Sequence, residues 1–167
     1  YLTSGKSHDS EIRLTKFMIN TLEPDNQVLD IGAHYGFFTL LSSRLVGEAG
    51  QVFAFEPSER SFSILDRNSH FSNITIFQEA VAEKTGTLQF HEFSNLYSEY
   101  NAIDITQFEQ RPWFDRRAIK SYDVPVNTID RITSNGQFRP GFIKIDVQGA
   151  EDKVIDGGKT YLQNSGP

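Results

Sequence analysis

The stretch VLDIGAHYG at residues 28–36 decides how this chain folds. A short apolar run leads into two glycines, Gly32 and Gly36, and an amphipathic segment begins directly after them. The run predicts a buried strand at 27–31, and the segment predicts a helix at 37–46. Gly32 permits a tight turn, whereas Gly36 permits the close approach of a ligand or a strand. The following helix N-terminus would offer free N–H groups to a carboxylate or phosphate.

Outward from this turn, strands and helices alternate, as in an α/β domain with a parallel sheet. The first helix is expected to start at Asp9 or Ser10 as N-cap and to stop before Pro24. Pro125 lacks an N–H group, so it predicts an edge position for its short strand. The pattern predicts strands at 51–55, 74–77, 124–126 and 142–147, an antiparallel strand within 82–93, and helices at 11–22, 58–68, 128–132 and from 150 onward.

The composition of the 167 residues excludes several classes of protein. Hydrophobic residues make up 38% and charged residues 23%, which is typical of one globular domain, here 1–167. The net charge of −6 argues against nucleic-acid and anionic-membrane partners. No apolar run approaches the roughly 20 residues of a membrane span. The absence of cysteine excludes disulfides and thiolate metal sites, and we expect a cytoplasmic location.

An acidic residue, Glu56, ends the second predicted strand. A carboxylate at that place suits the two hydroxyls of a ribose. The glycine turn and Glu56 together therefore predict nucleoside binding. The alternative is a structural turn followed by an unrelated glutamate.

The residues of the turn narrow the choice of nucleoside. His34 stands where a dinucleotide-binding turn has its middle glycine, so it would obstruct a pyrophosphate. Asp30, two residues before the first glycine, favours a cationic or amine-bearing ligand. S-adenosylmethionine combines an ammonium, a sulfonium, a carboxylate and a ribose, and it is the expected cofactor. An NAD-dependent oxidoreductase is the less favoured enzyme.

Further motifs show a resemblance to a known family. Asp30-x-Gly32-x-x-x-Gly36 followed by FAFEPS at 53–58 is similar to the first two motifs of class I S-adenosylmethionine-dependent methyltransferases. VNTID at 126–130 and IKIDVQGAE at 143–151 resemble the signature of the FkbM-type methyltransferases. The resemblance implies transfer of a methyl group to a hydroxyl of a small molecule or glycan. The alternative from another class is a non-catalytic nucleoside-binding or assembly module.

The resemblance also implies a fold, a Rossmann-like, mostly parallel sheet with helices on both faces. The family has seven strands in this sheet, and only four main strands are accounted for here. The chain stops at Pro167, about where a fifth strand would begin. We therefore expect a C-terminally truncated domain that lacks the last strands. Otherwise a second copy would have to cover the open edge at 142–147.

The resemblance places Asp146 near the reactive methyl group. The candidates for receiving the hydroxyl proton are Asp146, His34 and Glu151, although either acid could instead cap a helix. No metal is expected, because Asp146 and Glu151 make no spaced ligand set for Mg²⁺. Lys144 is expected to face away from its apolar neighbours, as a partner of a carboxylate or a functional amine. The residues expected to contact the cofactor are Asp30, Gly32, Ala33, His34, Tyr35, Gly36, Glu56, Pro57, Glu79, Ala80 and Asp146.

Two residues depart from the family pattern, which often has Asn in place of His34 and Glu in place of Gln148. A polar segment at 94–122, rich in Tyr, Trp and Phe, is expected to be an insertion or lid. Its aromatic side chains are candidates for substrate recognition, and the alternative is that they pack onto the domain.

Overall fold

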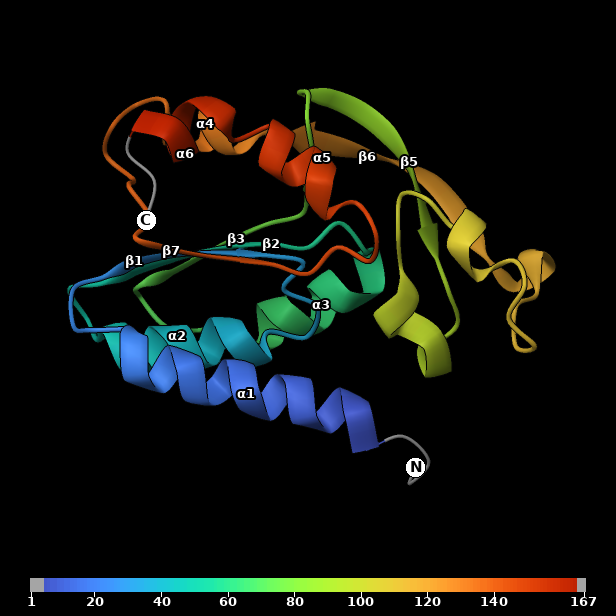
Figure 1. The fold of residues 1–167 in the computed structure, drawn as a ribbon, viewed down its shortest axis with the longest axis horizontal. Coiled ribbons are helices and arrows are strands. Elements are labelled where there is room, and N and C mark those ends of the chain that lie inside the picture. The colour runs from blue at the N-terminus through green and yellow to red at the C-terminus, as the bar shows by residue number, and fades with distance from the viewer. Residues whose placement is uncertain (1–4, 165–167) are drawn as a thin grey trace.

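A four-stranded parallel sheet forms the centre of the structure, a computed structural model that describes residues 5–164 (Figure 1). The strands lie in the order β3-β2-β1-β7, so β1 has β2 on one side and β7 on the other. The direction of winding therefore reverses between β1 and β7, where α/β sheets bind ligands. These strands are β1 (Gln27–Ile31), β2 (Gln51–Phe55), β3 (Ile74–Phe77) and β7 (Phe142–Ile145).

Helices cover both faces of this sheet (Figure 1). Alternation along β1 explains why both faces bury a core. Val28 packs with Met18 on one face, whereas Leu29 packs with Val154 on the other. One face carries α1 (Gly5–Thr21), α2 (Phe37–Val46) and α3 (Glu59–Asn68), and the other carries α4 (Ile129–Thr133), α5 (Glu151–Asp156) and α6 (Lys159–Asn164).

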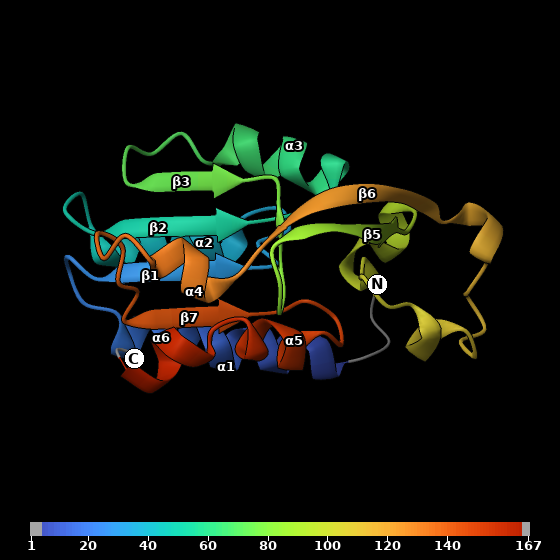
Figure 2. The same cartoon turned by 90° about the horizontal axis from the view of Figure 1, so that it is seen from above.

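A second, smaller sheet lies beyond the carboxyl ends of the parallel strands (Figure 2). Its strand order is β4-β6-β5, with β4 parallel and β5 antiparallel to β6. Three short 3-10 helices lie between β5 and β6 within the described residues. These elements are β4 (Ala80–Val81), β5 (Gly86–Glu92), η1 (Asn95–Tyr100), η2 (Thr106–Phe108), η3 (Arg116–Ala118) and β6 (Lys120–Asn127).

The structure confirms the predicted α/β class, the four strands of the main sheet and the antiparallel strand within 82–93. The helix expected at 58–68 is α3, and Ser58 is its N-cap, since its hydroxyl accepts a hydrogen bond from the Ser61 N–H at 3.1 Å. The predicted start of the first helix is wrong. The helix begins at Gly5, so Asp9 and Ser10 lie inside it, because no residue before them interrupts helical geometry.

The expected edge position of Pro125 is also wrong. Its strand, β6, is the middle strand of the smaller sheet. The proline is tolerated there because β4 pairs only with Val126 and Asn127. At Pro125 itself, the strand is paired on one side only, with Thr87 of β5.

The expectation of a truncated sheet concerns chain that would follow Pro167, which lies outside the described residues. Residues 84–126 add no described strand to the four-stranded sheet, and they build the smaller sheet instead. No helix in the described part of the chain is long and apolar enough to cross a bilayer.

Candidate functional site

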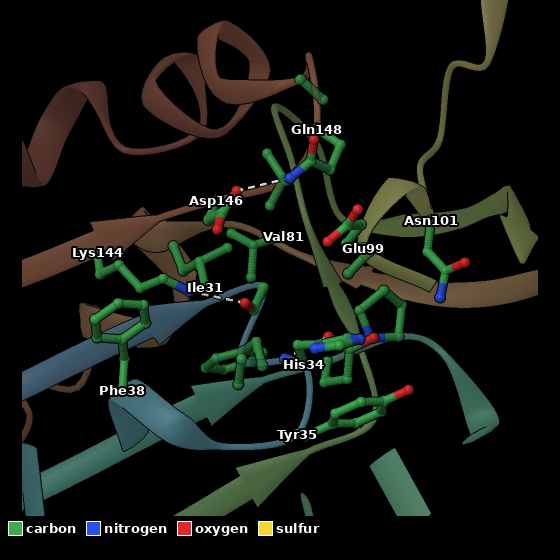
Figure 3. A pocket seen from close by; sticks show the side chains of 18 of the residues that line it. Ile31, His34, Tyr35, Phe38, Val81, Glu99, Asn101, Lys144, Asp146 and Gln148 are labelled. Atoms are coloured by element: carbon green, nitrogen blue, oxygen red, sulfur yellow. Dashed lines mark hydrogen bonds between the residues drawn. The ribbon is translucent and has the colours of Figure 1, made fainter. Parts of the chain in front are cut away.

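A cavity of about 340 Å³ opens at the carboxyl ends of β1, β2 and β7, at the switch point of the sheet. Small-molecule sites typically measure roughly 300–1,000 Å³. In Figure 3, Asp146 and Gln148 lie on one side of the cavity, and His34 and Tyr35 on the other. Of the residues expected to contact the cofactor, nine line it, namely Gly32, Ala33, His34, Tyr35, Glu56, Pro57, Glu79, Ala80 and Asp146.

The two glycines of the turn are required by packing inside the protein. Gly32 has a φ of +76°, and a Cβ there would overlap the carbonyl oxygen of Asp146. Gly36 has a φ of +91°, and a Cβ there would lie 2.7 Å from Leu65 of α3. Gly36 does not line the cavity. The close approach that it permits is therefore to a neighbouring helix.

The Glu56 carboxylate is held by two backbone N–H groups. Its Oε2 accepts from the His34 N–H at 2.8 Å, and its Oε1 accepts from the Ser58 N–H at 2.9 Å. The side chain is buried, and burial raises the pKa of Glu56 to about 7, although both hydrogen bonds lower it. Each oxygen has a second acceptor position for a ligand hydroxyl.

His34 has a φ of +52° and stacks on Tyr35 with ring centroids 3.7 Å apart. Its Nε2 lies 3.2 Å from the Ser98 Oγ of η1, and the Tyr35 hydroxyl lies 3.0 Å from the same atom. Burial lowers the pKa of His34 below its ordinary value, and Lys144 lowers it further. The imidazole is therefore neutral at neutral pH, and η1 is joined to the glycine turn.

Asp30 does not line the cavity, in contrast to the sequence-based prediction. Its Oδ1 forms a buried ion pair with the Lys144 Nζ at 2.9 Å, and its Oδ2 accepts from Thr39 at 2.6 Å. Parallel pairing of β1 with β7 sets Asp30 directly beside Lys144. The lysine also donates to the Gly32 carbonyl at 2.8 Å. This pair supports the turn, and Lys144 is the partner of a carboxylate.

The structure does not place all three candidates for receiving the hydroxyl proton at the cavity. Asp146 and His34 line the cavity, whereas Glu151 does not. Glu151 accepts from the Gly149 N–H at 3.1 Å, so it orders the turn before α5. Asp146 accepts from the Gln148 Nε2 at 2.9 Å through Oδ1. No group of three or more potential metal ligands occurs among the described side chains.

Glu79 lines the cavity, and its Oε2 accepts a hydrogen bond from the Asn127 Nδ2 at 3.0 Å. The aromatic side chains of 94–122 do not line the cavity. They pack on one another, with Trp113 stacked on both Tyr97 and Tyr100 at centroid distances of 4.7 Å and 4.8 Å. The packing alternative is therefore the one that the structure shows.

Sequence reasoning missed the polar residues that η1 and its neighbourhood bring to the cavity. Ser98, Glu99 and Asn101 line it. The Ser98 contact with His34 spans 64 residues of sequence, and no local pattern marks it. Gln148, which departs from the family motif, also lines the cavity.

The parallel sheet and the cavity at its switch point define a Rossmann-like fold with a site large enough for a small molecule. The family described as Methyltransferase FkbM domain matches residues 30–167. The chain therefore belongs to the FkbM methyltransferase family.

Similar proteins agree with this assignment. The chain is 28% identical over 165 residues to the 2-O-methyltransferase NoeI of Sinorhizobium fredii, covering 92% of this chain and 66% of that protein. It is 26% identical over 146 residues to Methyltransferase 1 of Beauveria bassiana, covering 80% and 58%. The chain thus spans less than two thirds of the length of these relatives.

A solved structure shows the same fold. The crystal structure of an FkbM methyltransferase from Methylobacillus flagellatus matches with a TM-score of 0.52 and 16% identity. The match covers 89% of this chain and 36% of that one.

Proposed function

We propose that this protein is an S-adenosylmethionine-dependent O-methyltransferase that acts on a hydroxyl of a small molecule or glycan. Membership of the FkbM methyltransferase family supports methyl transfer. The name of the NoeI relative supports oxygen as the methylated atom. The observation that carries the proposal is the Glu56 carboxylate, buried beside the cavity and oriented by two N–H groups.

The residues around the cavity fit this cofactor. Glu56 would accept hydrogen bonds from both ribose hydroxyls without reorganising, because its carboxylate is already fixed. The N-terminus of α2 has no side-chain cap, and Phe37 and Phe38 of its first turn line the cavity. Its free N–H groups suit the cofactor carboxylate. The imidazole of His34, by contrast, lines the cavity at the position of the middle glycine of a dinucleotide-binding turn, so it would obstruct a pyrophosphate.

The cofactor supplies a methyl group on a sulfonium sulfur, which leaves with the electron pair of the broken bond. The protein's contribution is to position the acceptor hydroxyl in line with that bond. Asp146 is the proposed acceptor of the hydroxyl proton, since its Oδ1 is held by Gln148 and its side chain is exposed at the cavity. Neutral His34, bound to Ser98, is the second candidate.

Calorimetric titration with S-adenosylhomocysteine tests the cofactor assignment. At pH 8 the Glu56 carboxylate is ionised, because its pKa is about 7. Hydrogen bonds to a charged group each contribute about 1.5–3 kcal/mol, so Glu56→Ala should raise the Kd about 100-fold or more. An unchanged Kd for this variant would remove the ribose assignment.

Two controls accompany the titration. Glu79→Ala removes another carboxylate of the cavity, and it should raise the Kd only about tenfold, since it loses one such hydrogen bond where Glu56→Ala loses two. NAD, titrated into the wild-type protein, should give no heat of binding. A response to NAD alone would favour an oxidoreductase and contradict the proposal.

A further inference from the structure

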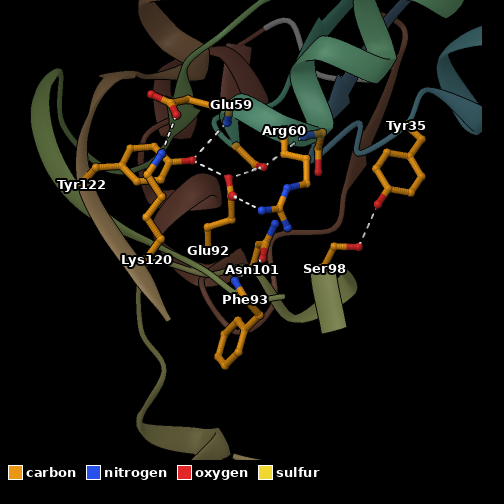
Figure 4. A network of polar contacts seen from close by, with 11 residues as sticks. Tyr35, Glu59, Arg60, Glu92, Phe93, Ser98, Asn101, Lys120 and Tyr122 are labelled. Atoms are coloured by element: carbon orange, nitrogen blue, oxygen red, sulfur yellow. Dashed lines mark hydrogen bonds and ion pairs between the residues drawn. The ribbon is translucent and has the colours of Figure 1, made fainter. Parts of the chain in front are cut away.

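Another buried carboxylate, Glu92, lies close to the Glu56 site but does not line the cavity. It is the last residue of β5, and its side chain is 4% exposed. Figure 4 shows it at the centre of a polar network between the smaller sheet and the start of α3. Arg60 lies nearby, 3.8 Å from its Oε1. Neither the family motifs nor the proposed chemistry uses this residue.

Glu92 is connected to Glu56 through a single residue, Ser58. The Ser58 hydroxyl donates to the Glu92 Oε2 at 2.8 Å and accepts from the Ser61 N–H at 3.1 Å. These two bonds use the hydroxyl as donor and as acceptor, so they fix its orientation. The backbone N–H of the same Ser58 donates to the Glu56 Oε1 at 2.9 Å.

A second contact fixes Glu92 itself. The Tyr122 hydroxyl of β6 donates to the Glu92 Oε2 at 2.7 Å and accepts from the Glu59 N–H at 3.0 Å. Lys120, also in β6, forms an ion pair with the Glu59 side chain at 2.6 Å. The smaller sheet therefore binds the first N–H group of α3, that of Glu59, through the Tyr122 hydroxyl.

We propose that Glu92 is a positioning residue for Glu56 and acts on it through Ser58. The inference rests on the proposed function, in which Glu56 binds the ribose. Without the Glu92 carboxylate, the Ser58 hydroxyl loses its acceptor, and Ser58 is held only by its helix contacts with Ser61 and Phe62. The Ser58 N–H then holds the Glu56 Oε1 less firmly, and the His34 N–H becomes the firmer contact of this carboxylate.

The loss has two measurable consequences for Glu56. Binding of the ribose weakens, because the carboxylate must be ordered when the ligand arrives. The pKa of Glu56 rises above about 7, because the Ser58 N–H is the hydrogen bond that lowers it most. Protonated Glu56 cannot accept from both hydroxyls, so ligand binding should then require a higher pH.

The test measures the Kd for S-adenosylhomocysteine between pH 6 and 9. Glu92→Leu should raise the Kd about tenfold at pH 7, and the pH midpoint of binding should move upward. Glu92→Gln keeps an oxygen that accepts from Ser58, and it should restore both values to within about twofold of the wild type. Glu92→Asp, which is too short to reach Ser58, should behave as Glu92→Leu does and replaces it if that variant does not fold.

Tyr122→Phe is the matched control. It removes the other hydroxyl that donates to Glu92 and leaves the Ser58 hydrogen bond in place. A purely structural network predicts equal losses for Tyr122→Phe and Glu92→Leu, and that result would overturn the proposal. So would a folded Glu92→Asp protein with the wild-type Kd and pH midpoint.

Failure of the proposed function would look different. In that case the wild-type protein would not bind S-adenosylhomocysteine at all. The positioning of Glu56 could still be measured without a ligand, because the stability of the free protein changes with pH as Glu56 titrates. Glu92→Asp should move that pH upward, and an unmoved pH would overturn the positioning role by itself.

Discussion

The two sheets of the molecule hold their polar side chains in different ways. At the carboxyl edge of the parallel sheet, Glu56 and Glu151 are both fixed by backbone N–H groups. In the smaller sheet and its 3-10 helices, side chains are held mainly by other side chains. Examples are the stacking of Trp113 on its aromatic neighbours and the hydrogen bonds to Glu92. The first arrangement depends on the path of the main chain, and the second depends on which side chains meet.

The largest expected effect concerns the path of the main chain at Gly32. Gly32→Ala places a Cβ against the Asp146 carbonyl, between two strands that cannot separate. We expect a loss of more than about 4 kcal/mol in the free energy of unfolding. Chemical denaturation measures this loss. A Gly32→Ala variant with near-wild-type stability would contradict the claim that the path of the main chain fixes this edge of the sheet.

Gly136→Ala is the matched control for this substitution. Gly136 has a similar φ of +69°, but its nearest neighbour is the end of the Arg139 side chain at 3.6 Å. The variant isolates left-handed backbone strain from steric overlap. It should cost only about 1–2 kcal/mol.

The next effect is a dependence of stability on pH that comes from Glu56. Its pKa is 4.5 in the unfolded chain and about 7 in the folded protein. Between these values the folded state keeps a proton that the unfolded state has lost, so stability falls as pH rises from about 4.5 to above 7. The shift corresponds to about 3 kcal/mol.

Denaturation of the wild type and Glu56→Gln from pH 4 to 9 measures this effect. The stability curve of the variant should lack the fall that Glu56 causes in the wild type. Parallel curves for the two proteins would show that Glu56 is not a buried, proton-binding carboxylate.

Sequence alone could predict the half of the molecule that depends on local spacing. The apolar run before Gly32, the capping serine at position 58 and the acid at the end of β2 are each defined by a few consecutive residues. Local runs of this kind predicted the strands of the main sheet. Nine of the predicted contact residues line the cavity, and one of them, Asp146, was implied by the family resemblance.

The remaining features could not be predicted because they arise from contacts between distant segments. The sequence predicts Asp30 as a ligand contact, but the pairing of β1 with β7 places Lys144 beside it, and the two side chains form an ion pair. The aromatic segment looked like a recognition surface, although its rings are used to pack against each other. The contact between Ser98 and His34 cannot be predicted from the residues that surround either of them in the sequence.

The smallest expected effect is a loss of stability in the aromatic cluster that leaves binding in the cavity of the parallel sheet unchanged. Trp113→Ala should lower the free energy of unfolding by about 2 kcal/mol, because a partly buried ring loses two stacking partners. The Kd for S-adenosylhomocysteine should stay within about twofold of the wild type. Trp113→Phe should recover most of the stability, and a large change in Kd would show that the aromatic cluster shapes the cofactor site.

The central claim is that Glu56 binds the two ribose hydroxyls of the cofactor. A crystal structure of the protein grown with S-adenosylhomocysteine at pH 8 tests it directly. The account predicts the nucleoside in the cavity, with both ribose hydroxyls at hydrogen-bond distance from the Glu56 carboxylate. An empty cavity, or a ribose bound away from Glu56, would contradict it.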